Sequence, residues 1–389
     1  QQTVQNQAES LARSFQATGD PLFDDRYVEG IQKVTAEEIL RVAREYFRPE
    51  RLNTVIIDPA GAEIETETAT IGEDAESPVL RKQLRNGLTV LLKRHAVQPM
   101  VSIRAFAKAG VLSDSDETAG RANLAAEVMV RGTEKYTGDE IAEYFDSIGG
   151  TLSVESGRNT TYLTADVLAD DFTESLDYVH QILFKPAFPQ DEFETQQQLQ
   201  LGQIASRLAN PQTEILDFWV RSLPDENPYS QTVEGRPETV SELTADGVRE
   251  FHRRVFVPQN MVIAVYGDLD PQQTLELMER TFGQVPAAKS FNFREFAKEH
   301  ENSAAETVRL ESEQQGTAMI IIGYPTVSVY DEKTRSALEV LNTLLTGGRG
   351  AGGVLFDELR GERLVYYVFG FELTGLAPGY FVFMAQTRP

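Results

Sequence analysis

The sequence predicts an α/β chain that contains repeated domains. Short apolar runs of strand type alternate with longer stretches of helical apolar spacing along most of the 389 residues. Asn86-Gly87 is a tight-turn signal between two strand candidates. Residues 35–49 align without gaps with residues 244–258, and Thr, Ala, Arg, Phe and Pro coincide. Because both segments run from a helical pattern through a Pro into an apolar strand, a duplicated domain explains the match better than chance.

The first 58 residues have the character of the end of a domain. Helical spacing covers residues 8–16 and 36–47, Thr35 is a suitable N-cap, and residues 54–57 are a strand candidate. The alignment with 244–258 implies that residues 1–58 are the tail of a domain whose body lies upstream. Residues 59–79 then contain six acidic residues and no Lys, Arg or aromatic residue, which is typical of a solvated linker.

Residues 80–285 are expected to form one complete domain. Its strand candidates are residues 88–92, 100–107, 151–155, 161–167 and 261–266. Its helical segments are residues 118–131, 137–148, 171–185, 191–208, 212–222, 245–256 (after the cap Thr244) and 271–282.

A further domain is expected after a polar linker at residues 286–305. Its strand patterns cover residues 317–323, 365–371 and 380–385, and its helical patterns cover residues 331–345 and 354–361. Residues 315–348 show a weaker similarity to residues 98–133, because each segment has an apolar strand, an acidic pair and a long helix. Residues 306–389 lack a closing helix, so we expect a truncated domain in a segment of a longer protein.

The charge balance argues against two classes of partner. The chain has 60 acidic and 36 basic residues, a formal net charge of -24. Such a surface repels phosphate groups, so we expect neither nucleic acid nor an anionic membrane as partner. The excess charge is either a solvated surface, which we favour, or a preference for basic peptides. The compartment is not determined; a soluble protein of the bacterial periplasm, or a secreted one, is compatible with the sequence.

The residues offer little chemistry of their own. There is no cysteine, and the four histidines are His95, His180, His252 and His300. No two of them have the i, i+4 spacing that places zinc ligands on one helix face. We interpret each as a surface or packing residue. No GxSxG elbow is present either, so the chain is not expected to be an enzyme by itself.

One helical segment nevertheless resembles a metal-binding helix in the order and spacing of its residues, and we call this pattern the frame. Residues 118–133, TAGRANLAAEVMVRGT, resemble the zinc helix of M16 (insulinase/pitrilysin-like) peptidases, whose pattern is G-x-A-H-x-x-E-H-M-x-x-x-G-T. Asn123 stands at the first His, Ala126 at the general-base Glu, and Glu127 at the second His. The distal Glu ligand of the family falls near Gly202. An amide and a carboxylate make a poor zinc site, and we interpret Asn123 and Glu127 as a hydrogen-bonded pair.

Three other segments resemble the same family in the same order. They are RKQLRNGLTVLLKRH, FHRRVFVPQNMVIAVYGDLD and FDELRGERLVYYVF. The resemblance implies M16 (LuxS/MPP-like) domains with mostly antiparallel sheets covered by helices. It also implies that Arg360 and Tyr367 match the Arg and Tyr that the non-catalytic half supplies to a shared chamber. Leu364, where the family usually has Gly, and the added Tyr366 depart from the pattern.

The resemblance implies a function for the chain as the non-catalytic half of a zinc metalloendopeptidase. It would bind no zinc itself, since zinc belongs to the parent's catalytic half, in the same chain or a partner subunit. Arg360 and Tyr367 would hold a peptide substrate and stabilise the transition state; the alternative is a helix-end Arg and a packed Tyr. A catalytically inactive scaffold or peptide-binding subunit is the other function, and an HxxEH motif upstream or in an adjacent gene would discriminate the two.

Overall fold

The computed structural model describes residues 14–15, 18–20, 23, 26–27, 33–46, 78–224, 227, 229–288, 318–347 and 352–388. The chain divides into two units, Gln1–Ala69 and Thr70–Pro389. The predicted strand at 54–57, most of the predicted helix at 8–16 and most of both predicted linkers lie outside the described residues. The predicted domain limits therefore stay predictions.

The first unit contains helix α3 (Ala36–Tyr46), and its N-terminus is capped by Thr35. The Thr35 backbone donates to Glu38 Oε2 (2.9 Å), and the Glu38 backbone donates to Thr35 Oγ1 (3.3 Å), a reciprocal capping box. Helix α10 (Ala245–Val255) of the second unit is capped by Thr244, whose Oγ1 accepts from the Gly247 backbone at 3.1 Å, without the reciprocal bond. Both helices begin and end at residues that the sequence repeat aligns, which supports the predicted duplication.

A six-stranded sheet forms the larger part of the second unit, in the order β1-β2-β6-β3-β5-β4. Adjacent strands of the sheet pair antiparallel, except for β2 and β6, which pair parallel. Alternate residues are buried along each central strand, so one face packs and the other stays partly exposed. The strands are β1 (Leu80–Gln83), β2 (Thr89–Arg94), β3 (Met100–Lys108), β4 (Thr151–Ser156), β5 (Thr160–Leu168) and β6 (Met261–Gly267).

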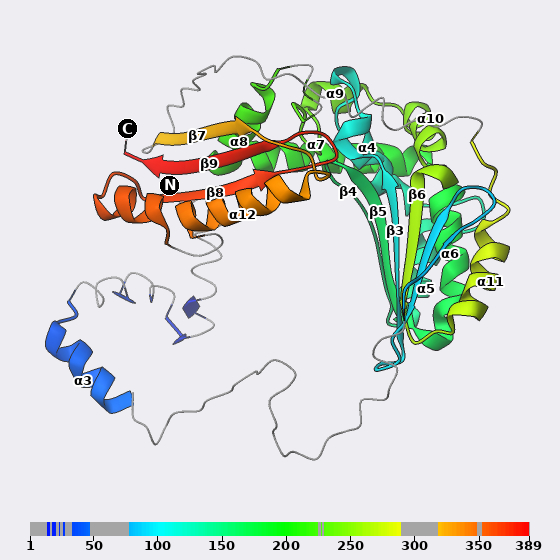
Figure 1. The fold of residues 1–389 in the computed structure, drawn as a ribbon, viewed down its shortest axis with the longest axis horizontal. Coiled ribbons are helices and arrows are strands. Elements are labelled where there is room, and N and C mark those ends of the chain that lie inside the picture. Colours follow the sequence, from blue (N-terminus) through cyan, green and yellow to red (C-terminus); the bar gives the residue numbers. More distant parts are fainter. Residues whose placement is uncertain are drawn as a thin grey trace. The chain divides into compact units, whose positions relative to one another are not determined.

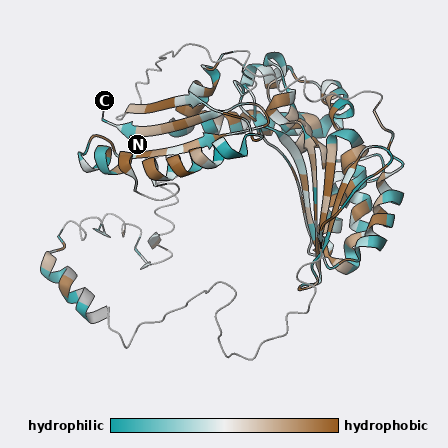
Figure 2. Ribbon diagram, in the orientation of Figure 1, coloured by the Kyte–Doolittle hydropathy of each residue, from teal (hydrophilic) through white to brown (hydrophobic). Residues whose placement is uncertain are grey.

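Helices cover the buried face of this sheet. Helices α6 and α11 lie along it in Figure 1, where α6 contacts β5 and α11 contacts β2, and Figure 2 shows that the strands of this sheet are rich in apolar residues. The core they close includes Ile103, Leu163, Leu176 and Ile263, all at 0% exposure. The other helices of this part are α4 (Arg121–Met129), α5 (Gly138–Ser147), α6 (Phe172–Phe184), α7 (Gln190–Leu208), α8 (Pro211–Arg221), α9 (Pro237–Glu242) and α11 (Pro271–Phe282).

A three-stranded antiparallel sheet follows, in the order β7-β9-β8. It consists of β7 (Ala318–Pro325), β8 (Tyr367–Leu373) and β9 (Tyr380–Thr387), with helix α12 (Glu332–Thr346) packed on β8 (Figure 1). This order repeats β3-β5-β4 of the large sheet, because the third strand again pairs between the first and the second. The weak sequence similarity of 315–348 to 98–133 thus corresponds to a repeated topology.

The predicted fold class is confirmed, as helices pack on mainly antiparallel sheets. Two local predictions need correction. The short helix predicted at 354–361 contains a π-helical turn, η8 (Phe356–Arg360), and the six-residue helix α9 was not predicted because it is too short to show periodicity. In the parts of the chain that can be described, no helix has the length and apolarity needed to span a membrane.

Candidate functional site

Helix α4, which carries the metal-site frame, begins at a glycine that no other residue could replace without strain. Gly120, its N-cap, has a left-handed φ of 92°. A Cβ atom there would lie 2.5 Å from the carbonyl oxygen of Glu234 and 2.9 Å from Gln200 Nε2. The close approach of these groups fixes where the helix starts relative to α7 and the loop before α9.

A buried amide pair lies where the frame would place the metal. Asn123 Nδ2 donates to Gln200 Oε1 at 3.1 Å. Gln200 Nε2 in turn donates to the carbonyl oxygens of Gly120 (3.0 Å) and Glu234 (2.8 Å). The two side chains are 9% and 1% exposed, so their hydrogen bonds are protected from water.

This arrangement corrects two interpretations made from the sequence. Asn123 pairs with Gln200 and not with Glu127, so the expected i, i+4 hydrogen bond was wrong. The position on α7 that faces α4 is Gln200, whereas Gly202 is exposed, and a Cβ atom added there would have no neighbouring atom within 4 Å. The distal position of the frame is therefore two residues earlier than predicted.

The residues at this place do not fit a zinc ion. Zinc sites use imidazole, thiolate and carboxylate ligands, but Asn123 and Gln200 are neutral amides already bonded to each other. Glu127 is the one carboxylate of the frame, and burial raises its pKa, which disfavours the charged form that a metal needs. Within the described ranges, no group of three His, Cys, Asp or Glu side chains is arranged to hold a metal. Ala126, a buried methyl group, cannot act as a base.

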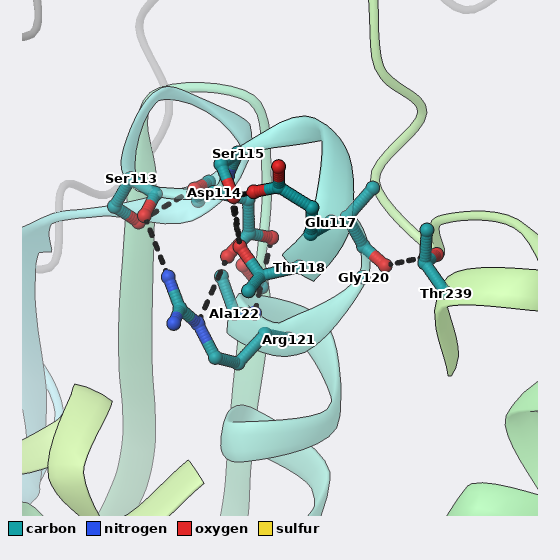
Figure 3. Close-up of polar contacts among 12 residues, drawn as sticks. Ser113, Asp114, Ser115, Glu117, Thr118, Gly120, Arg121, Ala122 and Thr239 are labelled. Atoms are coloured by element: carbon teal, nitrogen blue, oxygen red, sulfur yellow. Dashed lines mark hydrogen bonds and ion pairs between the residues drawn. The ribbon is translucent and has the colours of Figure 1, made fainter. Parts of the chain in front are cut away.

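A second buried cluster lies at the N-terminus of α4 (Figure 3). Asp114 Oδ2 accepts from the Ala122 backbone at 3.2 Å, and Arg121 Nε lies 3.4 Å from Asp114 Oδ1. Arg121 also donates to the Ser113 carbonyl (3.1 Å) and lies over the Phe251 ring at 4.8 Å. Burial raises the pKa of Asp114 to about 7 despite the guanidinium. No local sequence pattern indicates this pair, because its partners come together only in the fold.

The described histidines are packing residues. His252 is buried, stacks on Phe256 (ring centroids 4.7 Å apart) and bonds the Leu183 carbonyl at 3.1 Å. Burial lowers the pKa of His252 to about 4, so it is neutral at physiological pH. His95 stacks on Tyr266 and His180 contacts Phe282 edge-on. His300 lies outside the described residues.

The structure places Arg360 in the turn before the small sheet and Tyr367 on its strand β8, in different surroundings. Arg360 ends the η8 turn, is exposed, and donates to the Val365 carbonyl at 3.4 Å. Tyr367 begins β8 and accepts a hydrogen bond from Gln212 Nε2 of α8 at 3.3 Å. The two side chains thus have separate hydrogen-bond partners. Whether they act together on a substrate stays a prediction.

Two family models match the chain. Residues 89–235 match insulinase (peptidase family M16), and residues 242–389 match the peptidase M16 inactive domain. The chain belongs to the M16 peptidase family. An uncharacterized zinc protease of Streptomyces coelicolor is 26% identical to it over 336 residues, which are 85% of this chain and 72% of that protein. An uncharacterized zinc protease of Mycobacterium leprae is 27% identical over 75% of this chain and 65% of its own length.

Solved M16 structures share the fold. The M16 inactive domain from Pseudomonas fluorescens superposes with a TM-score of 0.70 at 21% identity, over 80% of this chain and 75% of that one. A protease from Helicobacter pylori gives a TM-score of 0.72 at 19% identity, over the same shares. Pitrilysin gives 0.61 at 19% identity, and 35% of its length is covered. The chain thus corresponds to part of an M16 peptidase, with the frame of the zinc helix but not its ligands.

Gly120→Ala should destabilise the protein strongly. We expect a loss of about 3–5 kcal/mol, because a methyl group would displace Gln200 and the Glu234 carbonyl in addition to straining a left-handed backbone. The matched control is Gly149→Ala, which has a φ of 62° but open space around the new methyl group and should cost about 1–2 kcal/mol. Urea denaturation of both variants measures the difference. Equal losses would contradict the packing argument.

Asp114→Asn should remove a pH dependence from the stability. The folded carboxyl, with a pKa of about 7, keeps its proton where the unfolded one, with a pKa of about 3.9, has lost it. Its contribution to stability is therefore present at about pH 4 and is lost as the pH rises through about 7. We expect the free energy of unfolding of the native chain, minus that of the variant, to fall by about 1–3 kcal/mol between about pH 5 and about pH 8.

Chemical denaturation at the two pH values tests this expectation. The matched change Glu143→Gln, at an exposed position of α5, should leave the pH dependence as it is in the native chain. A difference between the native chain and Asp114→Asn that stays constant with pH would show that Asp114 is ionised in the fold at all these values.

Proposed function

We propose that this chain is the non-catalytic half of an M16-type zinc metalloendopeptidase and that it works beside a catalytic half that holds the zinc. The observation that carries the proposal is the buried Asn123–Gln200 amide pair on a helix that keeps Gly120, Ala122, Gly132 and Thr133 of the zinc-helix pattern. The frame supports a peptidase architecture for the chain. Because the amide pair stands where metal ligands would be, this half would not hydrolyse peptides by itself. The catalytic half would be another part of the same protein or a separate subunit.

The small sheet offers a surface for an extended peptide. Strand β8 lies at the edge of that sheet, and an edge strand presents unpaired backbone groups that can accept a peptide as an added strand. Tyr367, Phe369 and Phe371 stack along one face of β8, with ring centroids 5.7 and 5.8 Å apart. We propose that the substrate peptide lies along this edge and contacts the aromatic row.

Tyr367 is suited to donate a hydrogen bond to a substrate. Its oxygen accepts from Gln212, which leaves the phenolic proton available for a carbonyl oxygen. Burial raises the pKa of Tyr367, so the phenol stays protonated at neutral pH. A positioned donor of this kind stabilises the negative charge that develops on a peptide carbonyl during attack. Arg360, exposed seven residues earlier, would bind a neighbouring backbone carbonyl.

Tyr367→Phe in the assembled peptidase tests the proposal. Removing one donor to the oxyanion should lower kcat by about one to three orders of magnitude with a smaller effect on KM. The measurement is steady-state hydrolysis of a fluorogenic peptide by the chain combined with its catalytic half. Tyr266→Phe, which alters an exposed tyrosine on β6 stacked on His95, is the matched control and should leave kcat unchanged.

Kinetics of Tyr367→Phe equal to those of the native protein would contradict the assigned role. If, in addition, the chain bound peptides or partner proteins without affecting hydrolysis, the alternative of an inactive scaffold or peptide-binding subunit would hold instead.

A further inference from the structure

A pocket of about 530 Å³ lies where the η8 turn leads into β8. Three arginines contribute to its wall, Arg360, Arg363 and Arg388, together with Leu364 and Tyr366. The volume is in the range of sites that bind small molecules or a few residues of a peptide. Leu364 and Tyr366 are the two residues that depart from the M16 pattern in this segment, and both line the pocket beside Arg360, which matches the pattern.

Arg363 occupies a backbone position that normally belongs to glycine. Its φ is 58°, in the left-handed region. The Leu364 backbone donates to the Leu359 carbonyl (2.9 Å), and the Arg363 backbone donates to the Arg360 carbonyl (3.0 Å), so Arg363 is the left-handed residue that ends a helical turn. A side chain in that conformation is strained relative to glycine. A strained arginine that lines a pocket is a reason to look for a ligand.

The three guanidinium groups have no carboxylate partner among the residues that the structure describes. All three are exposed, unlike the less exposed Arg121 and Arg207, which pair with Asp114 and, at 2.7 Å, with Asp217. The pocket thus gathers three positive charges in a chain with a formal net charge of -24. The surrounding negative charge disfavours loose binding of anions elsewhere on the surface, so a positive pocket would be selective.

We propose that this pocket binds a carboxylate group of the peptide substrate. Guanidinium groups bind carboxylates through paired, charge-assisted hydrogen bonds, and Leu364 and Tyr366 provide apolar contact for the adjoining residue. The proposal rests on the proposed function, since it takes the ligand to be a peptide on the small sheet, and it specifies the substrate class. The carboxylate is either the C-terminus of the peptide or an Asp or Glu side chain. The preference is opposite to that for basic peptides, which was the less favoured interpretation of the acidic composition.

Isothermal titration calorimetry of the full chain with three matched peptides tests the proposal. The peptides are acetyl-Ala-Ala-Ala-Ala-Gln with a free C-terminus, acetyl-Ala-Ala-Ala-Ala-Glu amide, and acetyl-Ala-Ala-Ala-Ala-Gln amide. We expect the third, which has no carboxylate, to bind at least about 10-fold more weakly than one of the first two. Preference for the first identifies a C-terminal carboxylate as the ligand, and preference for the second identifies a side chain. Equal affinity for all three would overturn the proposal.

Two variants separate binding from folding. Arg363→Gly should relieve the left-handed strain and raise the melting temperature, yet weaken the preferred peptide by about 10-fold or more. Arg388→Gln should weaken it to a similar degree without changing the melting temperature. Native affinity in both variants would overturn the proposal. If the native chain shows no carboxylate preference but Tyr367→Phe lowers kcat as predicted, the pocket proposal alone is refuted. If the native chain prefers carboxylate peptides but Tyr367→Phe leaves kcat unchanged, the proposed function alone is refuted.

Discussion

The side chain of Gln200 joins three segments that are distant in the sequence. From the middle of α7 it accepts from Asn123 on α4 and donates to the carbonyl oxygens of Gly120 and Glu234. A buried amide is costly unless its groups are bonded, and here both donor hydrogens and the oxygen have partners. The start of α4, the middle of α7 and the loop before α9 are consequently held in one arrangement, and Gly120 is the residue that allows them to approach.

This arrangement explains how a peptidase frame can persist without its chemistry. A zinc helix must present its ligands to a shared ion, but in this chain the corresponding groups bond to each other. The helix still packs against β4, α7 and α10, so it keeps its structural part. Asp114 and Arg121, which are buried at the N-terminus of this helix, likewise have their partners within the fold. Each bonds to the backbone, and the two side chains lie against each other. The groups that we propose to contact a ligand, Arg363 and Tyr367, lie instead in the turn before β8 and at the start of that strand.

The elements were easier to predict from the sequence than the contacts between them. Helix α11 has the predicted limits, Pro271–Phe282, because Asp270 caps it and a Pro begins it. Gln200 was missed because the distal position was read from the local pattern LQLGQI. The buried positions of α7, Phe193, Gln196, Gln200 and Ile204, repeat every three or four residues, and that spacing would have identified a glutamine on an apolar face.

The turn before β8 shows a different limit. The family usually has Gly where this chain has Leu364, but the left-handed residue of the turn is Arg363. Which residue takes that conformation depends on where the helical turn ends, and this is set by the hydrogen bond from Leu364 to Leu359. Likewise, the gathering of Arg363 and Arg388 in one pocket arises from the pairing of β8 with β9, which no local pattern contains.

The central claim is that an amide pair occupies the place of the metal site in this half of the peptidase. A zinc titration measured by calorimetry tests it most directly. The native chain should bind no stoichiometric zinc, whereas the triple variant Asn123→His, Glu127→His and Gln200→Glu should bind one ion per chain, because the frame around those positions is preserved. One tightly bound zinc per native chain, lost on changing Asn123 or Glu127 to Ala, would contradict the account.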